Sequence, residues 1–166
     1  NLTLSSTNGD LDKSIAGLDE KIAFTANAVG TGSVTTMIEN VEQTLGIDIR
    51  IKTSLSASAV TTTYNVGKNL VITLKDSDGK GISGATLTVN LGSSKKYTTD
   101  KNGQVKIAIG KLVPKTYTAK ISYGGNETYL ASQATAKVTV KKATPKITAK
   151  AKTFKFEDKT KKYTIT

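Results

Sequence analysis

Apolar and polar residues alternate through residues 70–140, in short runs separated by turn-forming residues. In the first run Leu70, Ile72 and Leu74 alternate with polar or smaller residues, and the turn sequence 76–79 follows. Because successive side chains of a strand point to opposite faces, such runs predict strands with one face in a core and one in water. Four further runs have the inward residues Ala85, Leu87, Val89 and Leu91; Val105, Ile107 and Ile109; Tyr117, Ala119, Ile121 and Tyr123; and Ala136, Val138 and Val140. We therefore predict a mainly β protein with an antiparallel β-sandwich over residues 54–142.

Residues 1–53 have a weaker pattern, which predicts a smaller, mainly β segment. Leu2 and Leu4 alternate as one short strand, and residues 22–28 as a second. A third run begins at Ile47 and continues toward residue 55. We expect this segment to form an incomplete, strand-accepting sandwich.

A short helix is predicted within that segment, over residues 36–46. Thr36 and Glu39 have the spacing of a capping box, and Gly46 is a suitable helix end. The apolar residues on one helical face are Ile38, Val41 and Leu45. Residues 10–21 also show helical spacing, weakened by a central glycine. For both stretches the alternative is a loop packed over the sheet.

Residues 143–166 repeat the opening of the sandwich. Residues 53–59 match 144–151 at an offset of 92 positions, and 68–73 match 161–166 at an offset of 93. A linker followed by the opening strands of a further repeat is therefore expected here. Because the chain begins without Met, it is expected to be a processed protein or a piece of a longer one.

The composition argues against an enzyme. The 166 residues include no His and no Cys, which removes the commonest general base, the thiolate nucleophile and the usual zinc ligands. A weakly catalytic glycan-acting or peptidase accessory domain is the competing hypothesis, but the carboxylates lie in predicted turns rather than in apolar settings. No cofactor is expected, and no run approaches the roughly 20 apolar residues of a membrane span.

The net charge of +11 is unevenly distributed. Residues 1–53 carry −3, residues 54–140 carry +7 and residues 141–166 carry +7. Lysines account for 23 of the 24 basic residues and aromatic residues are few, which argues against a nucleic-acid partner. Solvated outward lysines on strands are the main interpretation, and a basic surface facing an anionic cell envelope is the alternative.

Two acidic turns are the best polar clusters for a metal. Asp76 and Asp78 could share a hard cation through their oxygens, but the neighbouring glycine and the missing bidentate Glu favour an ordinary turn. The sequence around Asp100 offers the same turn chemistry. Gly79, Gly84 and Gly103 are expected to have positive φ, and Gly103 ends the turn that begins at Asp100.

Other candidate positions concern modification and contact. Asn1 and Asn126 begin Asn-x-Thr sequons and are possible glycosylation sites in an exported protein. Tyr97 and Tyr129 lie near predicted loops and are possible contact residues. Tyr117 and Tyr123 are expected to be core residues whose hydroxyls reach water.

A family resemblance is carried by three runs, residues 75–89, 97–105 and 125–132. These runs resemble the immunoglobulin-like repeats of large bacterial and methanogen cell-surface adhesin-like proteins, over roughly residues 53–166. The resemblance implies an extracellular, surface-anchored protein whose repeats space or present an adhesive surface. It also implies neighbouring repeats, and a cell-surface glycan or protein ligand, as partners.

Assembly by strand donation is the alternative function. The tail, residues 146–166, has apolar residues at alternate positions, namely Ile147, Ala149, Phe154, Phe156, Tyr163 and Ile165. The head, residues 1–52, and the tail have opposite charge. We therefore expect the tail to donate a strand to the head of another copy and build a filament. The rival is a tail that pairs only within a longer parent protein.

Overall fold

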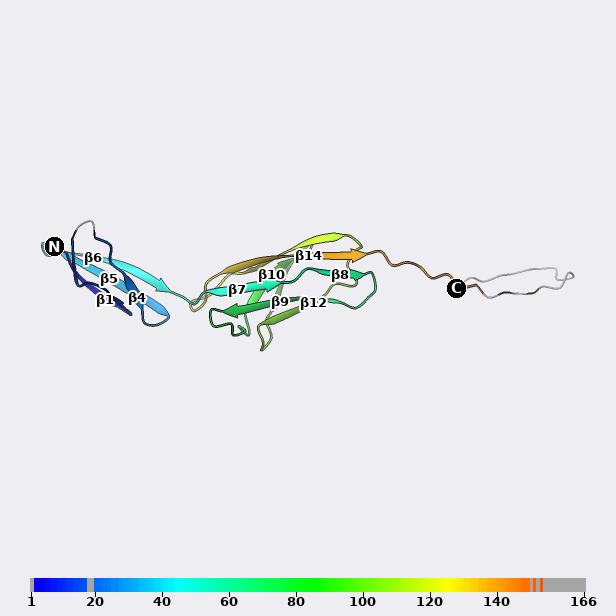
Figure 1. Cartoon of the computed structure of the whole chain (residues 1–166), viewed down its shortest axis with the longest axis horizontal. Coiled ribbons are helices and arrows are strands. Elements are labelled where there is room, and N and C mark those ends of the chain that lie inside the picture. The colour runs from blue at the N-terminus through cyan, green and yellow to red at the C-terminus, as the bar shows by residue number, and fades with distance from the viewer. Residues whose placement is uncertain (1, 18–19, 150, 152, 154–166) are drawn as a thin grey trace.

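The computed structural model describes residues 2–17, 20–149, 151 and 153, and in this part of the chain all regular structure is β (Figure 1). The N-terminal strands are β1 (Leu2–Thr7), β2 (Gly9–Leu11), β3 (Ile15–Ala16), β4 (Phe24–Ala26), β5 (Gly30–Ile38) and β6 (Val41–Ile49). The central strands are β7 (Thr53–Ala57), β8 (Val60–Thr63), β9 (Asn69–Asp76), β10 (Thr86–Asn90), β11 (Ser94–Thr98), β12 (Gln104–Ala108), β13 (Thr116–Tyr123) and β14 (Ser132–Lys141).

The central strands form two sheets around a shared core. One sheet has the order β11-β10-β13-β14-β8 and the other the order β12-β9-β7. The division into a β10-β13-β14 sheet and a β7-β9-β12 sheet is that of an immunoglobulin-like sandwich. Of the residues predicted to face inward, Leu91 and Tyr117 are only partly buried, and the rest are buried in one cluster. The alternation along the sequence therefore identified the core.

The sandwich is entered at one end and left at the other. Thr53, the first residue of β7, donates its hydroxyl to the hydroxyl of Ser132, the first residue of β14, at 2.7 Å. From there β14 runs the length of the sandwich, and the chain continues away from its far end (Figure 1). After β7 the chain changes sheets, and β8 then pairs in parallel with the end of β14.

The N-terminal strands make a separate four-stranded sheet of order β3-β1-β5-β6, accompanied by the small β2-β4 pair. Its connection to the sandwich is Ile51, whose N–H donates to the Thr128 carbonyl at 2.8 Å. The Ile51 carbonyl accepts the N–H of Leu130 at 2.9 Å. The strand predicted to run from Ile47 toward residue 55 is thus divided into β6 and β7 at this junction.

The predicted helix over residues 36–46 is wrong, because these residues form the β5-β6 hairpin. Glu39 and Asn40 are its turn, with φ of 46° and 66°. Positive φ at both central residues is the type I′ geometry that matches the twist of paired strands, and Asn tolerates it well. The pairing runs from Ile38 opposite Val41 to the far end of the hairpin, so it satisfies more backbone groups than one capping box could.

The helical spacing over residues 10–21 was also misleading. The described part of this stretch contains β2 and β3, and β2 pairs with β4. Ala16 of β3 is buried, as is Leu4 of β1. The second predicted strand, residues 22–28, is shorter than expected and reduces to β4.

Candidate binding surfaces

The outer face of the five-stranded sheet carries hydrogen-bonding side chains in cross-strand rows. Thr88 of β10 lies opposite Ser122 of β13, which lies opposite Gln133 of β14. The next row consists of Asn90, Lys120 and Thr135. These rows arise because the intervening residues, such as Leu87 and Val89, point into the core.

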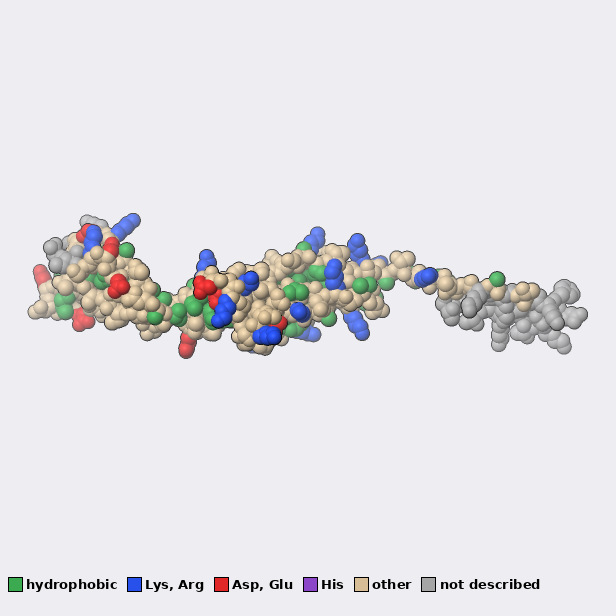
Figure 2. Space-filling view, turned by 60° about the horizontal axis from the view of Figure 1, so that its bottom comes forward, with side chains coloured by type: hydrophobic (Ala, Val, Ile, Leu, Met, Phe, Trp, Pro, Cys, Tyr) green, Lys and Arg blue, Asp and Glu red, His purple; other side chains and the backbone are tan. Residues whose placement is uncertain are grey.

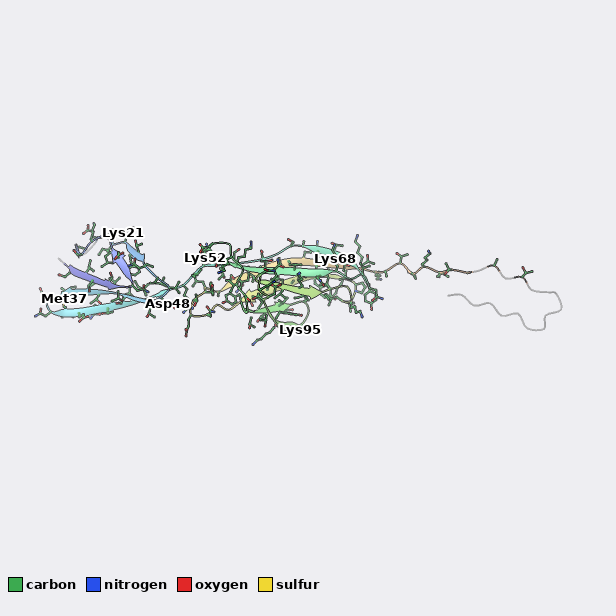
Figure 3. All side chains as sticks on the ribbon, turned by 90° about the horizontal axis from the view of Figure 1, so that it is seen from below. Lys21, Met37, Asp48, Lys52, Lys68 and Lys95 are labelled. Atoms are coloured by element: carbon green, nitrogen blue, oxygen red, sulfur yellow. The ribbon has the colours of Figure 1, made fainter. Side chains whose placement is uncertain are left out.

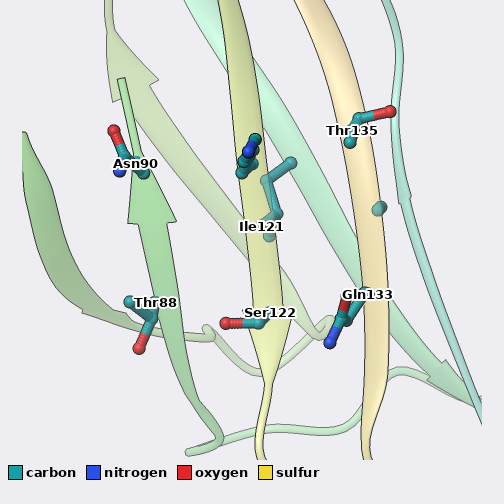
Figure 4. Close-up of a pocket in the computed structure, with 8 residues that line it drawn as sticks. Thr88, Asn90, Ile121, Ser122, Gln133 and Thr135 are labelled. Atoms are coloured by element: carbon teal, nitrogen blue, oxygen red, sulfur yellow. The ribbon is translucent and has the colours of Figure 1, made fainter. Parts of the chain in front are cut away.

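These two rows line a shallow hollow of about 600 Å³ (Figure 4). The side chains of Thr88, Ser122 and Gln133 point into it from three neighbouring strands. Its lining offers hydroxyl, amide and ammonium groups and contains no carboxylate and no aromatic ring. Such a set can hydrogen-bond a polyol or an anion but offers no ring for stacking.

Further lysines extend this face. Lys96 of β11 lies opposite Thr88, and Lys137 of β14 lies opposite Thr118; both lysines are exposed. The acidic residues of the sandwich, by contrast, lie at strand ends and in loops. Figure 2 shows Lys and Arg side chains spread along the sandwich, with several acidic side chains on the N-terminal part.

The two tyrosines predicted as contact residues are both half-buried. Tyr97 of β11 packs against the sandwich core and lines a second hollow of about 130 Å³. Tyr129 also packs against the core, beside the junction formed by Ile51. A contact role for either ring therefore stays a prediction.

Tyr117 and Tyr123, predicted as core residues, follow that prediction in part. Tyr123 is buried, and burial together with nearby Tyr129 raises the pKa of its hydroxyl above the usual value. Tyr117 packs against the core, and its hydroxyl donates to the Val113 carbonyl at 2.9 Å. The ammonium of Lys115 lies 4.8 Å from the Tyr117 ring centre, a cation–π distance.

The acidic loops have the geometry of tight turns. Oδ1 of Asp76 accepts the backbone N–H groups of Asp78 at 3.1 Å and Lys80 at 2.8 Å. Asp100 repeats the arrangement with Asn102 at 2.8 Å and Gln104 at 2.9 Å. These two bonds hold the pKa of Asp100 below its usual value. Within the described part of the chain, no three His, Cys, Asp or Glu side chains gather as a metal site would require.

Three glycines confirm the turn interpretation. Gly79, Gly84 and Gly103 have φ of 79°, 72° and 72°. At Gly103 a Cβ atom would also lie 2.4 Å from the Leu74 carbonyl oxygen, so this turn packs directly on β9. The same chemistry therefore explains both the acidic residues and the glycines.

The possible glycosylation sites differ in what the structure describes. Asn126 is exposed, and its Oδ1 accepts the N–H groups of Thr128 at 3.0 Å and Tyr129 at 2.8 Å. This leaves the side-chain nitrogen, the atom that a glycan would modify, pointing away from those bonds. Asn1 lies outside the described residues.

No model of a known protein family matches the chain, and no curated protein sequence matches it. Among solved structures it is similar to domains 4 and 5 of the S-layer protein SbsC, with 15% identity over 84% of this chain and 70% of that one, and a TM-score of 0.38. A chimeric titin Z1Z2 tandem is 13% identical over 85% of this chain and 84% of its own, with a TM-score of 0.41. The adhesin InvE of Yersinia pseudotuberculosis is 12% identical over 83% of this chain and 48% of its own, with a TM-score of 0.35.

At these identities the likeness concerns the fold alone. The chain spans 21% of the length of a structure of SbsC domains 1–6. The described residues contain no helix long and apolar enough to cross a membrane.

The predicted donor residues are described only in part. Ile147 and Ala149 are exposed, and Ile147 is 72% accessible to solvent. They lie in chain without regular structure that extends beyond β14 (Figure 1). Phe154, Phe156, Tyr163 and Ile165 lie outside the described residues.

One surface was missed by sequence reasoning, the free edge of β6. The sequence predicts a helix up to Gly46 and a strand only from Ile47, although Val41 and Leu45 also fit the alternation of a strand that continues to Ile49. The structure places this strand at the end of its sheet, with Leu45 67% exposed. Met37 lies at the outer tip of the hairpin and Asp48 near the sandwich (Figure 3).

Proposed function

We propose that this chain is a structural module of an extracellular surface protein, in which the sandwich spaces an adhesive surface from its anchor. The observation that carries the proposal is the path of the chain: β7 begins beside the start of β14, and the chain leaves at the far end of β14. A module with opposite entry and exit extends a stalk when it is repeated. The proposal assigns no catalysis and no cofactor.

The pairing of β8 with β14 suits such a module for load. The two strands are parallel; the chain reaches β8 from the entry end of the sandwich, through β7, and leaves β14 at the exit end. A pull on both ends therefore slides β8 and β14 in opposite directions, so that the hydrogen bonds between them are loaded together rather than one after another. The last of these bonds is the 2.8 Å contact from the Tyr64 N–H to the Lys141 carbonyl.

The sequence repeat supports an array of such modules. Leu55 of β7 matches Ile147, and Leu70 and Ile72 of β9 match Tyr163 and Ile165. In the sandwich Leu55, Leu70 and Ile72 are core residues. We infer that residues 146–166 repeat the alternation by which the opening strands of the sandwich bind a partner strand.

Single-molecule stretching of the full chain, attached through its two termini, tests the load-bearing role. We expect one major unfolding event that lengthens the molecule by about 280 Å, since about 90 residues at up to about 3.5 Å each extend to about 315 Å and the folded sandwich already spans about 33 Å along β14. Thr62→Pro should lower the unfolding force, because the N–H of Thr62 points to the same side as that of Tyr64, toward β14.

Two variants control for this change. Thr61→Pro alters a residue whose N–H points away from β14, and Thr62→Val removes only the hydroxyl that donates to the Val66 carbonyl at 3.3 Å. Both should unfold at a higher force than Thr62→Pro. Equal forces for all three variants, or unfolding of the unaltered chain at negligible force, would contradict the load-bearing role.

A second candidate function is binding of an anionic cell-surface polysaccharide, and the polar hollow over β10, β13 and β14 favours it. Lys120 lies at the centre of this face, with Lys96 and Lys137 on either side. Hydroxyl and amide groups from three strands surround Lys120. A sugar polymer with carboxylates would meet ammonium groups and neutral hydrogen-bonding partners together.

Calorimetric titration of the full chain with polygalacturonate, and with dextran as a neutral polymer, tests this candidate. We expect binding to polygalacturonate only, and a loss of at least about tenfold in affinity for Lys96→Gln/Lys120→Gln/Lys137→Gln. The matched control is Lys75→Gln/Lys101→Gln/Lys106→Gln, which removes the same charge elsewhere on the sandwich. If both triple variants lose affinity equally, net charge rather than this face accounts for binding.

A further inference from the structure

The edge strand β6 exposes apolar side chains to solvent. Its nine residues pair with β5 on one side, and no described strand pairs with the other. Leu45 is 67% exposed and Val41 57%, and neighbouring Ile38 of β5 is 45% exposed. An exposed, long, apolar edge strand is a template for an incoming strand.

Three of the four edge strands of the sandwich carry protection that β6 lacks. The edge strand β11 has Lys95 and Lys96, and the edge strand β12 has Lys106. The edge strand β8 has only four residues. Lysines and short length are the usual means of keeping a sheet edge unpaired, and β6 contains no lysine and no proline.

The two faces of β6 specify the strand that would fit. One face carries the mainly apolar set Val41, Gln43, Leu45, Ile47 and Ile49. The other face carries Glu42 and Asp48, separated by Thr44 and Gly46. A complementary strand needs apolar residues at alternate positions and basic residues, six positions apart, on its other face.

A second copy of β6 is a poor partner for this edge. An antiparallel pairing over the full strand would place Glu42 of each copy opposite Asp48 of the other. Arg50 pairs with Oδ2 of Asp48 in each copy, and it offsets only part of the repulsion from Glu42 at each of the two contacts. Like charges directly opposite each other destabilise a strand pair.

Residues 146–152 of the same sequence meet the requirement. Ile147, Ala149 and Ala151 alternate with Lys146, Thr148, Lys150 and Lys152. In one antiparallel register Lys146 lies opposite Asp48 and Lys152 opposite Glu42, since both pairs are six positions apart. The same register puts Ile147 opposite Ile47 on the apolar face.

We propose that β6 binds residues 146–152 of another copy as an added strand, through apolar contacts on one face and Lys-carboxylate pairs on the other. The donor must be another copy because β14, a strand about 33 Å long, carries the chain away from the head. Only four residues then separate the end of β14 from Lys146. A molecule whose head receives the tail of one copy, and whose tail binds the head of another, forms an open, head-to-tail filament.

Sedimentation velocity of the full chain over a wide concentration range tests this assembly. We expect oligomers that lengthen with concentration and weaken as salt is added. Glu42→Lys/Asp48→Lys should lower the association constant at least about tenfold, because attraction becomes repulsion at two places. The control Asp10→Lys/Asp78→Lys makes the same change in net charge away from β6 and should assemble like the unaltered chain.

A charge swap separates this contact from a general charge effect. Lys146→Glu/Lys152→Glu alone should also associate at least about tenfold more weakly than the unaltered chain, because its acidic tail meets an acidic head. An equimolar mixture with Glu42→Lys/Asp48→Lys should assemble again, since each tail then finds an opposite head. A mixture that stays monomeric overturns the proposal, and so does an unaltered chain that is monomeric at every concentration.

Pairing of β6 with its own copy is distinguished by neutralisation. Glu42→Gln/Asp48→Asn should weaken binding to a basic tail but strengthen pairing of two β6 strands. Stronger association of this variant would therefore replace the tail with a second β6 as the occupant. Far-UV circular dichroism of each variant shows whether its β-structure is retained.

Discussion

The sandwich and the N-terminal sheet are built from the same alternating pattern but differ in what covers their apolar faces. In the sandwich a second sheet closes over Leu70, Ile72 and Leu74, which are completely buried. In the described part of the N-terminal sheet the buried apolar side chains are Leu4 and Ala16. The difference shows that alternation specifies a strand, whereas the partner sheet determines whether the strand acquires a core.

This comparison gives each region a different source of stability. The sandwich draws its stability from a buried apolar cluster, in which each fully buried aliphatic side chain contributes about 1.5–3 kcal/mol. The N-terminal sheet depends on hydrogen bonds along the β5-β6 hairpin and on the junction at Ile51. Substitutions at equivalent strand positions should therefore have unequal costs in the two regions.

The largest expected difference is between Ile72→Ala and Leu45→Ala. Ile72 is fully buried at the centre of the three-stranded sheet, and removing its side-chain atoms should cost about 2–5 kcal/mol. Leu45 is exposed, so its truncation should cost less than about 0.5 kcal/mol in the monomer. Urea denaturation at a concentration where the chain is monomeric measures both values. Equal losses would show that the N-terminal sheet has a core comparable with that of the sandwich.

The next difference is between two glycines. Gly103→Ala should cost at least about 1 kcal/mol, because φ is 72° and the new Cβ would contact the Leu74 carbonyl oxygen. At Gly46 of β6 no atom lies within 4 Å of the position that a Cβ would occupy, so Gly46→Ala should be neutral or stabilise the protein by up to about 1 kcal/mol. Thermal denaturation of both variants checks the prediction, and a destabilising Gly46→Ala would indicate that β6 is packed on that face.

The same contrast explains how far sequence reasoning succeeded. Runs such as Leu70–Leu74 were read correctly because a buried strand repeats every second residue and its turns require Asp and Gly. The β5-β6 hairpin was misread because Ile38, Val41 and Leu45 fit helical spacing when the strand is broken by a two-residue turn. Glu39 and Asn40 lack the glycine that usually marks a type I′ turn.

Candidate sites were less predictable than the fold, because they depend on register. Nothing in the sequence indicates that Thr88, Ser122 and Gln133 form one row, since they come from three strands whose pairing is set by distant turns. Asp76 could be assigned to a turn in advance, because its partners are its own neighbours in the chain. The exposed edge of β6 depends on the order of strands within its sheet, which alternation does not determine.

A smaller difference concerns acid sensitivity. The pKa of Asp100 in the sandwich is lowered mainly by two backbone N–H groups, and that of Glu20 in the N-terminal region mainly by its hydrogen bond with the Lys13 side chain. Because both folded-state pKa values lie below the unfolded ones, each carboxylate stabilises the fold above its unfolded pKa, about 4. This stability is lost as pH falls through the folded value.

Salt should separate the two carboxylates in a titration followed by NMR. The Lys13–Glu20 pair is exposed, so added salt should move the pKa of Glu20 toward its usual value. The pKa of Asp100 should change less, because its partners are backbone N–H dipoles within its own turn. Equal responses to salt would mean that nearby lysines, rather than the turn, determine the ionisation of Asp100.

The smallest expected effect is at the hairpin turn, where Glu39→Gly should stabilise the N-terminal sheet by a few tenths of a kcal/mol. Glu39 has φ of 46°, which a residue with a side chain adopts at a cost and glycine adopts freely. Part of the gain is offset, since glycine also makes the unfolded chain more flexible. Amide hydrogen exchange should therefore slow in β5 and β6 and stay unchanged in β9 and β13. Slower exchange in both regions would show that the N-terminal sheet and the sandwich unfold together, whereas faster exchange in β5 would mean that Glu39 supports the turn in a way its backbone angle does not reveal.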